Sequence, residues 1–192
     1  DPRRRDPVSW QAGVLNEDGS FSVLSVVEAT IPPEQRFSIM GPFYLLTPSP
    51  PAAPPSPPPA PPSVPPLAPR PPSPPMGSAF MFVFTSLRVM PAADGIQLAG
   101  LVLIGADGQE VPVQSATNPD GVVSNENQKV DKLVDGKNWT KWYDGGFKKR
   151  GNSTVVLHLA SDTFVVEYYL VVAGDPRRRD PVSWQAGVLN ED

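Results

Sequence analysis

The sequence contains no cysteine and only one histidine, His158, in 192 residues. Without cysteine the chain has no disulfide framework and no thiol nucleophile. His158 lies between Leu157 and Leu159, a position typical of a structural histidine on a strand. The chain also lacks a glycine-rich phosphate loop, a zinc motif and a dinucleotide-binding motif. These absences predict that the protein is not an enzyme. A catalytic pair of carboxylates stays an open alternative, because such pairs have no fixed spacing in the sequence.

The chain also has no long apolar run and only a small net charge. No stretch approaches the roughly 18 apolar residues that span a bilayer, so we expect no membrane span in this segment. The net charge is −4 and the isoelectric point is near 5.0, which gives no reason to expect a nucleic-acid partner. Two short basic clusters occur, at 177–179 and 148–150. We interpret them as solvated loop charge, with contact to an anionic glycan as the alternative.

What the chain does contain is an internal duplication. Residues 1–18 recur without change as residues 175–192, which gives a period of 174 residues. Periodicity of this kind is typical of repeat architectures. The sequence therefore predicts a window onto a tandem array, in which residues 175–192 are followed by the equivalent of residues 19–47.

Proline is the second abundant feature, with 27 residues, of which 17 lie between Pro48 and Pro75. Each proline fixes φ and removes a backbone donor, so helix and sheet are both excluded there. Polyproline II remains, and at ~3.1 Å per residue the tract forms a stiff rod on the order of 85 Å long. A rigid linker is one interpretation, and an SH3-type ligand is another.

The Ser-Pro-Pro motifs of this tract resemble those of hydroxyproline-rich glycoproteins from green-algal and plant cell walls. The resemblance implies hydroxylated prolines that carry short arabinose or galactose chains. The candidate residues for hydroxylation or O-glycosylation are Pro50, Pro51, Pro54, Pro55, Pro57, Pro58, Pro59, Pro61, Pro62, Pro65, Pro66, Pro71, Pro72, Pro74, Pro75, Ser49, Ser56 and Ser73.

The period and the tract together predict the domain organisation. Residues 1–47 are expected to be the C-terminal part of one β-sandwich, 48–76 the rod, and 77–192 the N-terminal part of the next sandwich. A stiff rod disfavours folding back of residues 19–47 onto residues 77–192 of the same chain.

Outside the tract, the pattern predicts an all-β fold. Alternating or β-rich segments indicate strands at 79–84, 96–104, 111–113, 153–159, 164–172, 182–189, 21–27, 36–39 and 42–46. Ala160-Ser161-Asp162 reads as the turn between two of them, and Asn16 to Ser20 reads as a hairpin turn. Many short strands at regular spacing are typical of a sandwich.

Three segments then match a known pattern in order: KLVDGKNWTKW at 132–142, STVVLHL at 153–159, and RDPVSW at 179–184, followed by NED at 190–192 and Gly19 of the next repeat. Together they resemble the discoidin domain, also called the coagulation-factor type C or galactose-binding-like domain. The resemblance implies a jelly-roll β-sandwich with binding loops at one end. It also implies that Trp142 and Trp184 are core residues rather than sugar-stacking residues.

Many carbohydrate-binding members of that family hold a structural calcium ion, the one cofactor that the resemblance implies. Carried over by position, the ligands would be Asp135 and Thr140, with backbone carbonyls from Lys132 and Asn138. The family often adds a glutamate near the end of the domain, whereas residues 36–44 contain no acid. An Asp-Gly turn with a capping threonine is therefore an equal alternative.

Glycans are the remaining expected ligands. The sequons Asn138-Trp139-Thr140 and Asn152-Ser153-Thr154 make Asn152 and Asn138 candidate N-glycosylation sites. Loop residues Trp139, Tyr143 and Arg179 are the candidates for contact with a bound sugar.

Taken together, the sequence predicts a secreted structural repeat glycoprotein, of green-algal type, that builds an extracellular fibre, wall layer or surface coat. The expected partners are further copies of the chain and covalently attached glycans. The alternative is a carbohydrate-binding, agglutinin-like adhesion module that acts by avidity. A third possibility is a chain outside any array, whose two copies of the duplicated segment compete for one site and which oligomerises by swapping.

Overall fold

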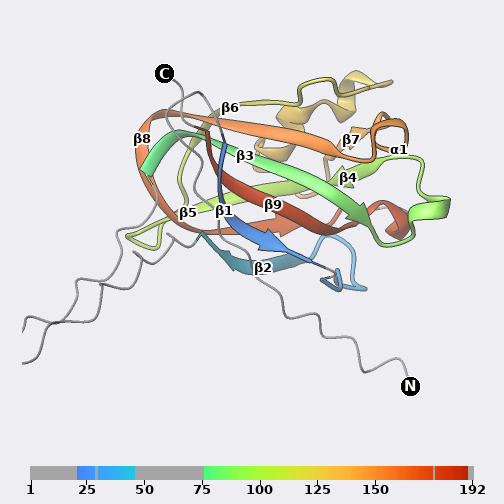
Figure 1. Cartoon of the computed structure of the whole chain (residues 1–192), viewed down its shortest axis with the longest axis horizontal. Helices are drawn as coiled ribbons and strands as arrows, with labels where there is room; N and C mark the ends of the chain where they lie inside the picture. The colour runs from blue at the N-terminus through green and yellow to red at the C-terminus, as the bar shows by residue number, and fades with distance from the viewer. Residues whose placement is uncertain (1–20, 29, 46–75, 175, 190–192) are drawn as a thin grey trace, which may run out of the picture.

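Strands make up most of the described chain. The computed structural model describes residues 21–28, 30–45, 76–174 and 176–189, and this part of the protein is all β with almost no helix (Figure 1). The helical pieces are a single turn, α1 (Phe147–Arg150), and four 3₁₀ turns, η1 (Met90–Ala92), η2 (Glu126–Gln128), η3 (Val130–Leu133) and η4 (Arg177–Arg179).

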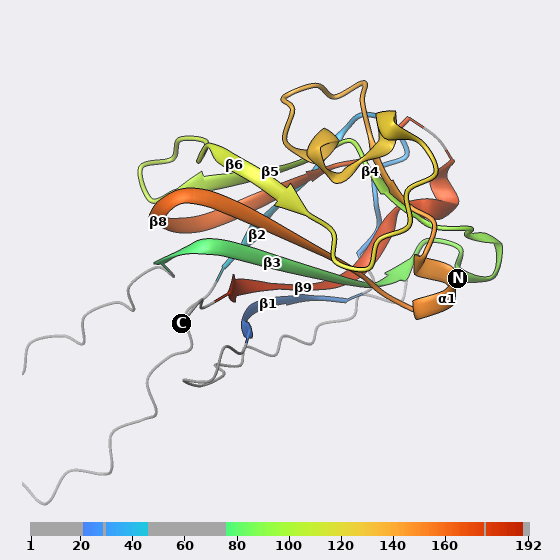
Figure 2. The ribbon, with the colours of Figure 1, turned by 90° about the horizontal axis from the view of Figure 1, so that it is seen from above.

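The strands form two layers that share one long strand, β8 (Ser153–Val171) (Figure 2). In the first layer the N-terminal half of β8 lies between two strands, and the order is β1 (Phe21–Val27), β9 (Pro181–Leu189), β3 (Met76–Leu87), β8, β6 (Val113–Thr117). In the second layer its C-terminal half lies between β2 (Ile39–Tyr44) and β5 (Gly100–Gly105). Strands β4 (Ile96–Leu98) and β7 (Trp142–Asp144) form a separate small pair.

The continuity of β8 corrects one prediction. The turn expected at Ala160-Ser161-Asp162 does not form, and the two predicted strands are halves of one strand. Its residues up to Leu159 pair with β3 and β6, and its residues from Val165 pair with β5 and β2. Small and polar residues suit the crossing between layers, where the backbone is exposed and β8 curves back toward the α1 end without a break in the strand (Figures 1 and 2). Sequence alone reads such residues as a turn.

Most other strand predictions hold with shifted limits, but the strand expected at 36–39 is wrong, because residues 36–37 form a turn and β2 begins at Ile39. The alternation at 79–84 marks the centre of β3, and the segment 96–104 is divided by Ala99 into β4 and β5. The short strand expected at 111–113 lies instead at Val113–Thr117. The strands expected at 21–27 and 182–189 are confirmed as β1 and β9.

Residues 21–45 belong to the same sandwich as residues 76–189. β1 pairs antiparallel with β9, and β2 pairs antiparallel with β8. The prediction that this segment stays apart from residues 77–192 is therefore wrong for this chain. The physical reason is complementarity, because the segment fills an edge of each layer and supplies Leu24, Val27 and Met40 to the core. The rod at 48–76 lies outside the described residues, except Met76, so its conformation stays a prediction.

The core between the layers is rich in aromatic side chains. Trp184 and Trp142 are both buried, as predicted. Trp184 donates its indole N–H to the hydroxyl of Tyr168 at 2.8 Å, and Phe43 stacks on the Tyr168 ring at 5.3 Å. Burial raises the pKa of Tyr168 to about 12. Phe43 comes from β2, so the segment 21–45 takes part in the core and does not merely cover it.

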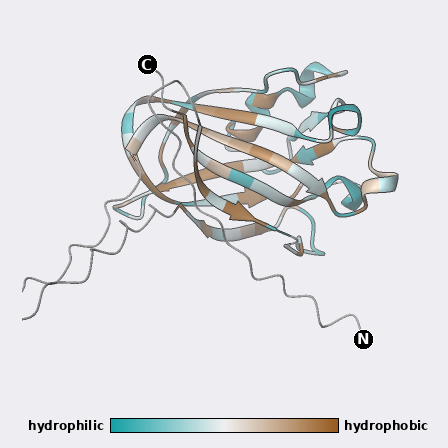
Figure 3. Cartoon of the chain, in the orientation of Figure 1, coloured by the Kyte–Doolittle hydropathy of each residue, from teal (hydrophilic) through white to brown (hydrophobic). Residues whose placement is uncertain are grey.

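The hydropathy of the ribbon follows this arrangement. Apolar residues run along the strands, and polar residues gather in the loops at the end that holds β7 and α1 (Figure 3). Within the described residues, no helix has the length and apolar character needed to cross a membrane.

Candidate functional site

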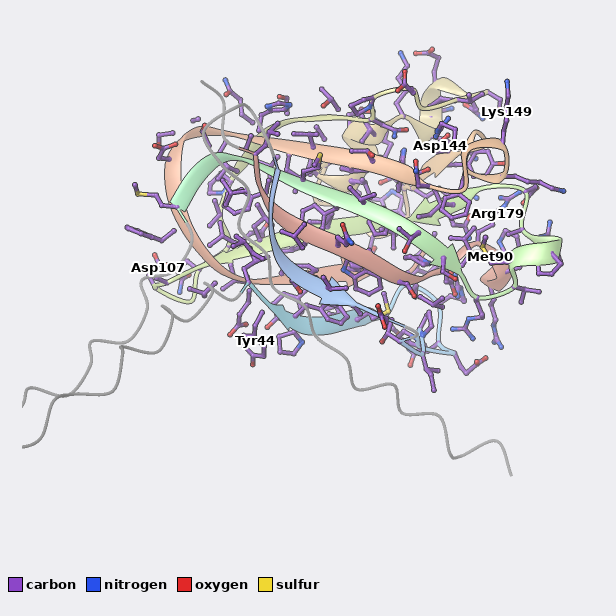
Figure 4. The ribbon with its side chains drawn as sticks, viewed as in Figure 1. Tyr44, Met90, Asp107, Asp144, Lys149 and Arg179 are labelled. Atoms are coloured by element: carbon purple, nitrogen blue, oxygen red, sulfur yellow. The ribbon has the colours of Figure 1, made fainter. Side chains whose placement is uncertain are left out.

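The end of the sandwich that carries β7 and η4 brings together two of the three predicted sugar-contact residues. The guanidinium carbon of Arg179, in η4, lies 4.5 Å from the centroid of the Tyr143 ring, in β7. Figure 4 shows Arg179 at the same end as Asp144 and Lys149, opposite the Asp107 turn. The geometry is that of a cation–π contact.

Asp94 completes this cluster, and sequence reasoning missed it. Arg179 donates to both carboxylate oxygens of Asp94, from Nε at 2.7 Å and from a terminal nitrogen at 2.6 Å. The Tyr143 hydroxyl donates to the backbone carbonyl of Asp94 at 3.1 Å. The guanidinium of Arg179 thus covers one face of the Tyr143 ring, and two of its nitrogens are bonded to the Asp94 carboxylate. The arrangement is a rigid support for the loops, and it leaves little of Arg179 for a sugar, since only 16% of its side chain is exposed.

The charges in this cluster shift two ionisations. The hydrogen bonds from Arg179 lower the pKa of Asp94 from its ordinary 3.8 to about 2. Burial, followed by the charge of Asp94, raises the pKa of Tyr143. The carboxylate is therefore ionised and the phenol neutral at every pH near neutrality.

The third predicted sugar-contact residue, Trp139, lies in the loop between η3 and β7 with 72% of its surface exposed. The ring contacts recorded for the described residues do not include it. An exposed indole of this size is the largest free aromatic face at the described loops, and it is suited to stacking on an apolar sugar face.

The loop around Asp135 brings the predicted calcium ligands together in part. The Thr140 hydroxyl lies 2.9 and 3.0 Å from the two carboxylate oxygens of Asp135, and the Lys137 amide donates to the same carboxylate at 3.0 Å. Gly136 has φ +69°, a conformation that glycine adopts readily. Lys132 and Asn138 lie in the same stretch, and Asn138 is exposed.

The oxygen count at this loop decides how well calcium fits. Calcium takes six to eight oxygen ligands, usually from several carboxylates. Here Asp135 supplies one carboxylate, while that of Asp131 bonds the Lys132 ammonium at 2.7 Å, which raises the pKa of Lys132. No group of three or more acidic, histidine or cysteine side chains poised to hold a metal is found among the described residues. The hydrogen bonds already present fit the alternative of a capped Asp-Gly turn, so calcium stays a prediction.

Asp144 is the most heavily bonded carboxylate in the described chain, and nothing in the sequence pattern singled it out. It is fully buried and accepts from the amides of Val122 at 2.9 Å and Gly146 at 2.8 Å. The Ser153 hydroxyl donates to it at 2.5 Å, and Arg150 pairs with it. These bonds join the loop that contains Val122 and the segment around Arg150 to the start of β8, so the role of this carboxylate is to hold the loops in place.

The arginines of the basic cluster at 177–179 lie beside acids, and Arg177 and Arg178 stay largely exposed, so only Arg179 departs from the interpretation as solvated charge. Arg177 pairs with Glu34, and Arg178 and Arg179 lie against Asp94. The acids come from sequence positions far from the arginines, so the pairing could not be read from the local sequence. Asp180, directly after the cluster, is fully buried and accepts two bonds from Arg36.

Both candidate N-glycosylation sites are exposed. Asn152 follows the left-handed Gly151 at the start of β8, and Asn138 lies in the loop beside the exposed Trp139. A cavity of about 190 Å³ lies between that loop and β5, lined by residues that include Val102, Leu133, Asn138 and Val171. Glu110, Lys137 and Asn138 add polar groups to its otherwise apolar walls.

No family model matches this chain, and no curated protein is similar to it at a significant level.

Proposed function

We propose that the chain is a repeat of an extracellular structural glycoprotein, in which discoidin-like jelly-roll sandwiches alternate with polyproline rods. The observation that carries this proposal is the register of β9 and β1. Phe21 lies opposite Leu189, and the pairing continues to Val27 opposite Trp184. If residue 192 were joined to residue 19, as the period requires, residues 190–192 and 19–20 would close a hairpin with a loop of five residues.

That register supports a contiguous domain in the array. Two strands that are far apart in this chain pair as neighbours of a hairpin would, which is the arrangement expected if one follows the other in each repeat. Each repeat would then hold a complete sandwich, and the rods would space successive sandwiches on the order of 85 Å apart. Stiff spacers between identical domains suit a fibre or coat, whose rods attached glycans would hydrate and shield.

The proposal is tested on native protein by mass spectrometry of the 48–75 peptide. We expect steps of one oxygen atom for each hydroxylated proline and a ladder of pentose additions. A bare, unmodified tract would overturn the wall-type assignment. Electron microscopy of a chain with several periods should then show globules at regular spacing, and irregular clusters would count against the rod.

A second function, carbohydrate binding by the repeated domain, is favoured by one observation, the exposure of Trp139. In this case Trp139→Ala abolishes binding on a glycan array, while Tyr143→Phe leaves it intact because the tyrosine ring is covered by Arg179. Absence of binding to any glycan by the unsubstituted chain would exclude this function and leave the structural one.

A further inference from the structure

The first layer of the sandwich has an outer face without charge. Its strands are β1, β9, β3, β6 and the half of β8 up to Leu159, and none of them contains an aspartate, glutamate, lysine or arginine. Such residues make up 19% of the whole chain. Native sheets usually carry charges, above all lysine, on exposed edges to keep other strands away. Both edge strands of this layer, β1 and β6, lack that protection.

Strand register arranges the outward side chains of this layer in rows. Phe82, Leu157 and Trp184 are buried and mark the inward side of their strands, so the alternate residues point outward. Paired residues on neighbouring strands share a side of the sheet. The first row across the layer is Val23, Gly187, Met81, Val156 and Thr117. The second row is Val26, Gln185, Val83 and Thr154.

These rows face away from the rest of the described structure. In Figure 2 the second layer lies on one side of β1, β9 and β3, and no described element covers the other side. The side chains of Val26, Met81, Val83 and Thr154 are partly exposed. A surface of valine, methionine and threonine leaves water at little cost, because it has no charge to desolvate.

Two such faces are complementary when their strands are aligned. A two-fold axis parallel to the strands, between β3 and β9, brings β3 of one copy over β9 of the other. Met81 then lies over Gly187 of the second copy, where the lack of a side chain leaves room. The same axis sets Val156 over Val23 of the second copy, which makes an apolar pair. We infer that two copies of this protein associate face to face through the outer face of the first layer.

The lack of charge on this face selects a second copy as the partner. Copies with a net charge of −4 repel each other, and a neutral face lets them meet where that repulsion is smallest. A strongly charged partner, such as an anionic polysaccharide, finds no group of opposite charge there. The association is therefore expected to depend on apolar contact and shape rather than on ion pairs.

The size of the face sets the strength of the contact. Strands about 4.8 Å apart, with some seven residues each at about 3.3 Å per residue, give a face on the order of 500 Å². Two copies then bury about 1,000 Å², which is near the lower limit of specific interfaces. One contact is weak, but several sandwiches of one array can meet several of another. The inference rests on the proposed fibre for this last step, and the dimer itself does not.

Sedimentation velocity of the full chain over a range of concentrations tests the contact. We expect a reversible equilibrium between monomer and dimer that persists at about 1 M salt, because no ion pair holds it. Met81→Lys should weaken dimerisation by roughly tenfold or more, since the ammonium group loses water in the contact. Val122→Lys is the matched control, because it adds the same charge at an exposed loop residue. Monomers at every concentration, or equal dimerisation by both variants, would overturn the inference.

A pair of opposite charges tests the orientation of the two copies. The two-fold axis sets Val26 over Thr154 of the second copy. Val26→Lys and Thr154→Glu should each weaken self-association, and a mixture of the two chains should form a heterodimer, because the introduced charges then face each other. A mixture that associates no better than either chain alone would refute the proposed contact. Both positions are partly exposed, so this pair decides the matter even if Met81→Lys fails to fold.

The outcome is separable from that of the proposed function. Thermal unfolding of each variant verifies that the sandwich is intact, and none of these measurements depends on modified prolines. A dimer with an unmodified 48–75 peptide would therefore overturn the wall-type assignment alone, whereas modified prolines on a strict monomer would overturn the contact alone.

Discussion

Arg36 and Asp180 form a two-bond ion pair across 144 residues of sequence, and the carboxylate of the pair is fully buried. A second arginine, Arg88, approaches the same carboxylate at 3.6 Å. The pair joins residues 21–45 to the residue directly before β9. The attachment of residues 21–45 therefore relies on one buried charge as well as on strand pairing.

Replacing Arg36 by Ala should lower the free energy of unfolding by about 3 kcal/mol, because it removes the main partner of a buried charge. Urea denaturation followed by tryptophan fluorescence measures this loss, since Trp184 lies in the adjacent strand β9. Arg178→Ala is the matched control, because its contact with Asp94 is 3.8 Å long and exposed. We expect a change below about 1 kcal/mol for it, and similar losses in both variants would contradict the special role of Arg36.

The stability of the loop cluster should depend on acid pH through Asp94. Its pKa is about 2 in the folded chain, below the ordinary 3.8, so folding is favoured by the ionised form. This contribution is fully present above about pH 4 and is lost as the pH falls toward 2. Thermal unfolding measured from pH 6 to pH 2 should show the loss, and Arg179→Gln should flatten the acid part of the curve. The same slope in that variant would mean that other carboxylates cause it.

The contact between the start of β3 and β9 leaves no room for a side chain at Gly77. A Cβ there would lie 2.4 Å from Cγ1 of Val188, so Gly77→Ala should cost roughly 1–3 kcal/mol. Adding Val188→Ala should restore part of that loss, because it removes the clashing methyl group. A double-mutant cycle in chemical denaturation measures the coupling, with Ser78→Ala as the control. Strictly additive effects would rule out the contact.

Calcium binding at the Asp135 loop is testable by calorimetry. If calcium binds there, titration of the unsubstituted chain releases or absorbs heat, and Asp135→Asn abolishes the signal because it removes the one carboxylate that faces Thr140. Asp131→Asn should leave the signal intact, since that carboxylate already pairs with Lys132. No heat from the unsubstituted chain would establish the loop as a capped Asp-Gly turn.

Glycosylation should favour Asn152 when the chain passes through a eukaryotic secretory pathway. Its side chain is exposed at a tight turn before β8, whereas Asn138 shares its loop with the bulky Trp139. Peptide mass spectrometry after glycosidase treatment should show full modification at Asn152 and less at Asn138. Asn152→Gln should remove one glycan without loss of stability, and a chain modified only at Asn138 would reverse this order.

The local features of the fold could be predicted from the sequence because they depend on short-range patterns. β1 and β9 lie where alternation of side chains placed them, and Trp142 and Trp184 are buried as expected of large apolar residues. The turn expected at Ala160-Ser161-Asp162 was wrong because the same residue types serve in an exposed, continuous strand. The residue types indicate that the backbone is exposed there, whereas only the strand pairing shows that the chain curves back within one strand and not through a separate turn.

The candidate site was found only in part, for a related reason. Tyr143 and Arg179 were picked out as polar and aromatic loop residues, and the structure places them in contact. The sequence did not single out Asp94, Asp144 or Asp180. Each of these carboxylates is important because an arginine pairs with it, and the spacing of residues in the sequence does not show that pairing. A carboxylate in a loop looks the same in sequence whether water or an arginine surrounds it.

The sequence by itself determined the period, the proline-rich tract and the strand-forming segments, since repetition and backbone restriction are properties of the residues in order. The tertiary structure decided that β9 lies between β1 and β3 and that residues 21–45 complete this sandwich. The partners of β9 and the bond between Arg36 and Asp180 join residues far apart in the sequence, so they exist only once the chain has folded.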